Sequence, residues 1–411
     1  MCGSVRRWAS LLAALVLVLP AAAGGRVNHH PLLWTLDWRT TDGIQAEVAL
    51  SWAIDDIFVI TRRRDVTAYD AATGVRRWTV PLTGAVCGGS HRASGGVVAV
   101  MFGRDSRACK KVALIDLRKG AKLWERTVRD GHFRAQFVVA ADVMVADWFL
   151  YGIAAFALKD GRPLWNMDGD RDGCTYGMLA GGAVLMAGLS CEGDGAKASR
   201  VQGIDPRSGR VLWTYDAPPG YVVSAMLSTR PVLLGLERRS TSDSSDVSRL
   251  VTLDASGVPG VHIDLGAELD CFRSDCGEVL VSGNTLYVGL YSTTPPGTGL
   301  PPLVAYDLTT GRVRWATEPD GRNVLPLAMD GGRLMVVRSG TSKGAGWNTP
   351  PQIVSVDPAT GRSKVELELT GLKYLYDSYE YGGGRFFVVD TRVADVRDPV
   401  VRAYGPDRRE E

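Results

Sequence analysis

The chain has 411 residues with 47 basic and 45 acidic side chains, so its formal net charge is only +2. This balance provides no overall attraction for phosphate backbones, and we therefore expect no nucleic-acid partner. Length alone suggests two or three domains, although a single long repeat array is an alternative if the sequence has a regular period.

The N-terminus has the layout of a cleavable secretory signal over residues 1–23. A basic pair, Arg6 and Arg7, precedes an apolar run from Leu11 to Leu19 and three alanines. The run is shorter than the ~20 apolar residues that a membrane span needs. We expect a mature chain of 24–411 that is secreted or held in the cell envelope, with 45 basic and 45 acidic residues. An uncleaved leader that anchors the protein in a membrane, or a twin-arginine export signal, remains an alternative.

The first strand expected in the mature chain lies at about residues 31–38. Its Trp34 has the same apolar setting as Trp78, but no partner strands precede it in the sequence. This strand therefore needs a partner from elsewhere in the chain.

From residue 68 onward one motif recurs, in which a strand ends in Asp, a tight turn contains Gly, and Trp follows eight residues after the Asp. Clear copies are AYDAATGVRRW (68–78), LIDLRKGAKLW (114–124), GIDPRSGRVLW (203–213) and AYDLTTGRVRW (305–315). Weaker copies are AFALKDGRPLW (155–165), TLDASGVPGVH (252–262) and SVDPATGRSKV (355–365). Successive copies are 41 to 53 residues apart, which fits one four-stranded propeller blade per copy.

Each residue type in the motif has a structural role. Asp with Thr or Ser binds backbone groups of the turn, and Gly adopts a positive φ that other residues resist. The indole is large enough to fill the seam between neighbouring blades, and its N–H can find an acceptor there. These seam residues are Trp34, Trp78, Trp124, Trp165, Trp213 and Trp315, with His262 at the Trp position of one weak copy.

The two ends of the chain predict how the ring closes. After the last full copy the sequence VVRAYGPD repeats the triplet once more and then lacks an outer strand. The unpaired N-terminal strand can supply it and remove the open edges of the ring. We therefore expect an all-β, eight-bladed, monomeric β-propeller with four-stranded antiparallel blades, closed by the N-terminal strand.

The motif resembles the pyrroloquinoline-quinone-type propeller repeat, which quinoprotein dehydrogenases share with the noncatalytic propeller lipoprotein of outer-membrane assembly. The resemblance covers nearly the whole mature chain and implies fold more than function. Trp follows the Gly turn and is not followed by Asp, which disfavours a WD-type propeller.

In such a propeller all the Asp-Gly turns lie on one face, and the connections between second and third strands lie on the other. The second face receives the long, variable segments, where binding residues are usually found. These segments are 103–111, 189–200, 237–249, 291–302 and 339–351.

Six cysteines remain after the leader, an even number that suggests disulfides in an exported chain. Cys87 and Cys174 precede innermost strands, whereas Cys109 and Cys191 follow the second strands of the same blades. The repeat register thus pairs Cys87 with Cys109 and Cys174 with Cys191. Cys271 and Cys276 are left to close a small loop.

One segment has the spacing of calcium ligands. Asp168, Asp170 and Asp172 are followed by Gly173, like the opening of a calcium loop, but Leu179 stands where an EF-hand needs Glu. We treat these carboxylates as a candidate Ca²⁺ site, with a solvated acidic turn as the alternative. Pyrroloquinoline quinone is not expected, because dehydrogenases of the resembled family stack it on a disulfide of adjacent cysteines, which this chain lacks.

Catalytic motifs are missing from the sequence: it has no H-E-x-x-H, Walker or G-x-S-x-G pattern. Aromatic residues in variable segments, Trp148 and Trp347, are candidate binding anchors. We therefore expect a noncatalytic binding or scaffolding propeller that recognises a protein or another envelope ligand. A quinone-dependent oxidoreductase and a membrane-anchored sensor domain are the alternatives.

Overall fold

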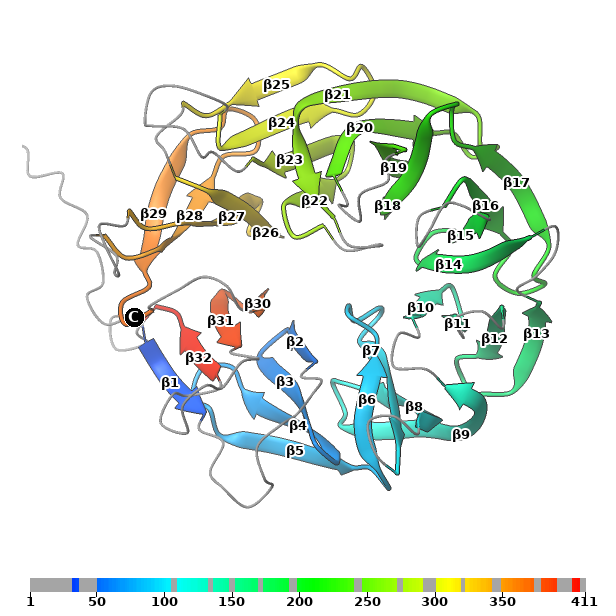
Figure 1. Cartoon of the computed structure of the whole chain (residues 1–411). Coiled ribbons are helices and arrows are strands. Elements are labelled where there is room, and N and C mark those ends of the chain that lie inside the picture. Colours follow the sequence, from blue (N-terminus) through cyan, green and yellow to red (C-terminus); the bar gives the residue numbers. More distant parts are fainter. Residues whose placement is uncertain are drawn as a thin grey trace, which may run out of the picture.

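The protein forms a ring of strands around a central axis in the computed structural model (Figure 1). The structure describes residues 32–36, 50–104, 109–131, 136–147, 152–168, 173–191, 198–239, 246–271, 276–290, 301–318, 322–341, 349–372, 378–389 and 401–406. Every element in these ranges is a strand, and the strands form eight four-stranded antiparallel sheets. The expected eight-bladed, all-β propeller is confirmed.

The first seven blades each use four consecutive strands, numbered from the axis outward. Blade 1 contains β2 (Ser51–Ile54), β3 (Ile57–Arg62), β4 (Asp65–Asp70) and β5 (Arg76–Pro81). Blade 2 contains β6 (Ala85–Gly89), β7 (Val97–Gly103), β8 (Cys109–Asp116) and β9 (Ala121–Gly131). Blade 3 contains β10 (Gln136–Ala140), β11 (Val143–Asp147), β12 (Ile153–Ala157) and β13 (Pro163–Met167). Blade 4 contains β14 (Cys174–Ala180), β15 (Leu185–Cys191), β16 (Arg200–Ile204) and β17 (Val211–Asp216).

The remaining blades continue this order until the last one. Blade 5 contains β18 (Tyr221–Thr229), β19 (Val232–Arg238), β20 (Asp246–Leu253) and β21 (Pro259–Asp270). Blade 6 contains β22 (Val279–Ser282), β23 (Thr285–Gly289), β24 (Leu303–Asp307) and β25 (Val313–Ala316). Blade 7 contains β26 (Val324–Asp330), β27 (Arg333–Arg338), β28 (Gln352–Val356) and β29 (Ser363–Glu368). Blade 8 contains β30 (Ser378–Gly382), β31 (Arg385–Val389), β32 (Val401–Tyr404) and β1 (Leu32–Leu36).

The N-terminal strand closes the ring as expected. β1 pairs antiparallel with β32, with Trp34 opposite Ala403, so the two ends of the described chain lie side by side (Figure 1). The Trp34 indole N–H donates to the carbonyl oxygen of Ala71 in blade 1 at 3.0 Å. Between the same blades, Phe58 stacks on Phe387 with ring centroids 4.6 Å apart. Backbone pairing of β1 thus completes blade 8, and the indole hydrogen bond and aromatic contact join that blade to blade 1.

The hydrophobic core is divided into eight clusters, one at each seam between neighbouring blades. This division follows from alternation: successive residues of a strand point to opposite faces of a blade, and both faces are covered by a neighbour. The strands accordingly contain long apolar runs, and no described helix is needed to cover them.

Six seams contain the same contact between an indole and a glycine. Each seam tryptophan packs against the turn glycine of the next blade, and a Cβ on that glycine would overlap the indole ring. Four of the indoles also donate to the carbonyl oxygen three residues before the glycine, as Trp124 does to Leu158 at 2.8 Å. The glycine is thus required twice, for its positive φ and for the space that it leaves to the ring.

Blade 5 departs from the repeat in a way that the sequence alignment missed. In this blade the turn glycine, Gly257, stands three residues after Asp254. In the other repeats the turn glycine stands four residues after the last residue of the triplet, so the outer strand of blade 5 is shifted by one position. Gly311 of blade 6 consequently packs on Val261, and His262 does not take the tryptophan position. The expectation for His262 was wrong because the spacing from Asp was counted without the shorter turn.

Candidate binding face

The two ends of the ring differ in how much they vary between blades. We call the end with the Asp-Gly turns the turn face, and the end with the connections between second and third strands the loop face. The strand bounds place the five long variable segments between second and third strands, as expected. The loop face is therefore where this chain departs most from its own repeat, and it is the candidate binding face.

The predicted aromatic anchors belong to connections at the loop face. Trp148 follows the end of β11, and Trp347 stands between β27 and β28. Both residues lie outside the described part of the chain. They remain predicted anchors, placed by the strands that flank them.

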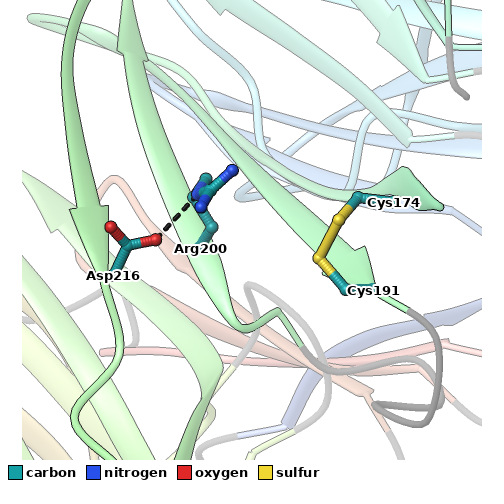
Figure 2. The surroundings of a disulfide bond; sticks show 4 residues. All are labelled: Cys174, Cys191, Arg200 and Asp216. Carbon is teal, nitrogen blue, oxygen red and sulfur yellow. Dashed lines mark hydrogen bonds and ion pairs between the residues drawn. A yellow bond between two sulfur atoms is a disulfide. The ribbon is translucent and has the colours of Figure 1, made fainter. Parts of the chain in front are cut away.

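Three disulfides lie at the loop face or lead to it, with the pairing that the repeat register predicts. Cys174 and Cys191 are opposite each other at the ends of β14 and β15. Figure 2 shows this bridge in blade 4, together with the ion pair between Arg200 and Asp216, whose atoms are 2.7 Å apart. The disulfide joins the loop-face ends of β14 and β15, and because Arg200 begins β16 and Asp216 ends β17, the ion pair joins the loop-face ends of the other two strands.

The other two disulfides hold different places. Cys87 lies inside β6 rather than before it, at a register shift, and Cys109 is the first residue of β8 rather than a residue following β7. The predicted pairing holds although both positions in the strands differ from the expectation. Cys271 and Cys276 close the connection from blade 5 to blade 6, and both are almost fully buried.

Buried carboxylates also lie at the loop-face ends of three blades, which the sequence analysis did not anticipate. Asp147 ends β11, Glu237 is the next-to-last residue of β19, and Glu278 precedes β22. All three are buried, and none is left without a partner. Burying a carboxylate is costly unless it is paired, so a partner is expected for each of them.

The candidate calcium ligands are only partly described. Asp168 directly follows β13 at the loop-face end of blade 3, whereas Asp170 and Asp172 lie outside the described residues. Within the described ranges, no group of three or more His, Cys, Asp or Glu side chains is arranged to hold a metal ion. The calcium site stays a prediction.

The chain's cysteines do not fit the quinone site of the dehydrogenases. Each of the six is bonded to a partner at least five residues away in the sequence. A disulfide between adjacent cysteines, on which the quinone ring would stack, therefore cannot form.

The turn face, by contrast, is built from one arrangement repeated. At Asp70, burial alone would raise the carboxyl pKa, but hydrogen bonds from Arg77, Thr73 and Ala72 outweigh it and lower the pKa to about 2. Hydrogen bonds within the turn likewise lower the pKa of Asp205, led by Ser208. These carboxylates hold turns together and show no feature of an acid or base poised for catalysis.

Ion pairs between blades support the same structural role for the turn face. Arg118 of blade 2 reaches Asp55 of blade 1 at 2.7 Å, and Arg207 of blade 4 reaches Asp142 of blade 3 at 2.8 Å. Both arginines stand two residues after the turn Asp of their repeat. Exposed pairs of this kind contribute little stability each, but they fix neighbouring turns relative to one another.

In the part of the chain that the structure describes, no helix is long and apolar enough to cross a membrane.

Comparisons with solved structures show similarity in fold. BamB from Moraxella catarrhalis is 14% identical with a TM-score of 0.51, and the match covers 86% of this chain and 95% of that one. The computationally designed Ika8 protein is 12% identical with a TM-score of 0.59, covering 92% of this chain and all of that one. No curated protein sequence matches this chain significantly.

Comparison with protein families assigns the chain more directly. The model for the family described as outer membrane protein assembly factor BamB matches residues 25–167, 108–257 and 197–364. The overlapping matches reflect the repeat, and together they span well over half of the sequence. The chain therefore belongs to this family of quinoprotein-like β-propellers.

Proposed function

We propose that this protein is an extracytoplasmic, noncatalytic scaffold that binds a protein partner through its loop face. The observation that carries the proposal is the contrast between the faces. The turn face repeats one arrangement, whereas the loop face holds variable connections on strand ends stapled by disulfides. Variable loops on a rigid base are suited to recognition, because little ordering entropy is lost on binding.

The family and the disulfides support the proposed location. The family is described as an outer-membrane assembly factor, and three structural disulfides are typical of proteins exported to an oxidising compartment. A leader at residues 1–23 would deliver the chain there. We propose no cofactor for the binding function, and that a single chain suffices for it.

Site-specific photocrosslinking tests the proposal in the native host. A photoreactive phenylalanine analogue replaces Trp347 in the loop face, and in a matched strain it replaces Lys159 in a turn of blade 3. We expect a discrete protein adduct from the Trp347 position and none from the Lys159 position. Adducts from neither position, or the same adducts from both, would contradict recognition by the loop face.

A spectroscopic control separates binding from oxidation. The purified mature protein is titrated with pyrroloquinoline quinone and Ca²⁺, and its absorption spectrum is recorded. We expect no stoichiometric quinone chromophore. A chromophore that forms one-to-one with the protein would replace the scaffold proposal with an oxidoreductase.

A further inference from the structure

The outer strands carry a band of charge at the turn face that the net charge of the chain conceals. In each of seven blades, three residues separate the turn glycine from the seam position. In chain order they are VRR (75–77), AKL (121–123), RPL (162–164), RVL (210–212), VPG (258–260), RVR (312–314) and RSK (362–364). We call these residues the rim. Nine of them are basic and none is acidic, although the mature chain as a whole is formally neutral.

Four of the nine basic rim residues form ion pairs with carboxylates of the turns and outer strands. The arginines that directly follow a turn glycine form none with the described residues, although Arg210 lies near enough to Asp205 to help lower the pKa of that carboxyl group. Arg162, Arg210, Arg312 and Arg362 occupy the same place in four blades, directly after the turn glycine, and all four are exposed. None of the four side chains donates a hydrogen bond or forms an ion pair with any described residue. The acidic residues of the outer strands, such as Glu125 and Asp216, lie beyond the seam position, toward the loop face.

The rim also gathers the exposed apolar side chains. Among the described residues, the large hydrophobic side chains that are exposed are Leu32, Val75, Leu123, Val211, Leu212, Val258 and Val313. All but Leu32 lie in the rim, and Leu32 takes the corresponding place in the closing strand. Val75 is 64% exposed and Val313 is 53% exposed. Arginines and bare aliphatic side chains therefore alternate along one edge of the ring.

The repeated seam contact places these residues at one level. Because the turn glycine of a blade packs on the indole of the preceding blade at six seams, the turns stand at equal heights around the ring. A flat anionic surface can meet many rim residues at once, whereas an extended peptide can meet only the few on one side. Arginines that bind headgroup phosphates, with aliphatic side chains entering just below them, are typical of surfaces that lie on a bilayer.

We propose that the rim docks the turn face of the ring onto an anionic phospholipid bilayer. In this orientation the loop face points away from the lipid and stays open to a partner. The inference does not depend on the proposed function, since it concerns the opposite face. It also needs no leader, because the rim belongs to the folded ring.

Vesicle sedimentation tests the proposal with the purified mature protein at about 0.1 M salt. We expect binding to vesicles of phosphatidylcholine mixed with phosphatidylglycerol, little binding to phosphatidylcholine alone, and progressive loss of binding as salt is raised. The R210E/R312E/R362E variant should bind at least about a hundredfold more weakly. The V75S/V313S variant should bind more weakly with its melting temperature unchanged.

A matched variant controls for net charge. R63E/R64E/R238E changes the charge by the same amount at exposed loop-face positions, and it should keep vesicle binding. Equal loss in both triple variants, or no binding of the wild-type protein to anionic vesicles, would overturn the proposal. So would self-association that needs the rim arginines in the absence of lipid, which would assign the rim to a second copy of the chain. Melting curves of all variants identify any that fails to fold.

Discussion

The turn face and the loop face are made by the same strands, yet the residues at the two faces are conserved between blades to different degrees. At the turn face, a glycine, a carboxylate and an indole recur because each blade must fit the next one. At the loop face, segments of different length and composition leave the strand ends, and disulfides hold the ends in place. The comparison teaches that repetition in this sequence marks what holds the ring together, and that departure from repetition marks what is free to bind.

Removal of the closing indole should have the largest effect on stability. Trp34→Ala deletes a ring that lies against Gly74 and near Phe58 and Phe387 across the last seam. We expect the free energy of unfolding to fall by about 3–5 kcal/mol, measured by urea denaturation. Leu32→Ala, in the same strand but 43% exposed, is the control and should change it by less than about 1 kcal/mol. Similar losses in the two variants would show that the indole does not close the ring.

Loss of a loop-face disulfide should cost somewhat less. Cys174 and Cys191 are separated by 17 residues, and the C174S/C191S variant should lose about 3 kcal/mol, because its unfolded chain is less constrained. Circular dichroism should still report the same strand content. Unfolding of the whole ring in this variant would mean that the loop face, and not the seams, holds the fold together.

Substitutions at two glycines with similar φ distinguish the cost of backbone strain from the cost of a steric clash with the seam indole. Gly120 and Gly283 both have a positive φ, but a Cβ on Gly120 would overlap the Trp78 ring, whereas a Cβ on Gly283 would meet no described atom within 4 Å. Gly120→Ala should lower stability by about 2–3 kcal/mol and Gly283→Ala by about 1 kcal/mol. Equal costs for the two substitutions would remove the steric reason for glycine at the seams.

Acid should weaken the turn face through its carboxylates. The folded pKa of Asp70 is lowered to about 2 from an ordinary value of 3.8, so its contribution is present above about pH 4 and is lost as the pH falls toward 2. Asp70→Asn should reduce the acid dependence of the unfolding free energy in this range and cost about 1 kcal/mol at pH 7. Chemical denaturation at several pH values measures both. An unchanged acid dependence would contradict the role of this carboxylate.

The architecture could be predicted from the sequence because the same turn and seam motif recurs from blade to blade. Gly, Asp and Trp at fixed spacing predict a turn and a seam, and seven copies with an unpaired strand at one end predict a closed ring of eight blades. The cysteine pairing followed from the same register. The reading failed at His262, where a turn shorter by one residue shifted the strand and brought Val261 into the seam.

Contacts between blades and the burial of individual polar residues could not be predicted from the sequence. The ion pair from Arg118 to Asp55 joins residues 63 positions apart, and the buried Glu237 has nothing in its local sequence that marks it as buried. The rim was visible only in part: an arginine after the turn glycine is part of the repeat, but its significance comes from the ring that brings the copies to one level. The candidate anchors Trp148 and Trp347 remain predictions of the sequence.

An exchange of segments tests the division between the two faces most directly. In one variant, residues 342–348 of the loop face are replaced by a Gly-Ser segment of equal length; in the other, the turn residues Leu158 to Gly161 are replaced by such a segment. Melting temperature is measured for both, together with the photocrosslinked adduct from a probe at Trp148. We predict that the loop variant keeps its melting temperature and loses the adduct, and that the turn variant melts at a clearly lower temperature but forms the adduct while folded. A loop variant that keeps the adduct, or a turn variant as stable as the wild type, would contradict the account.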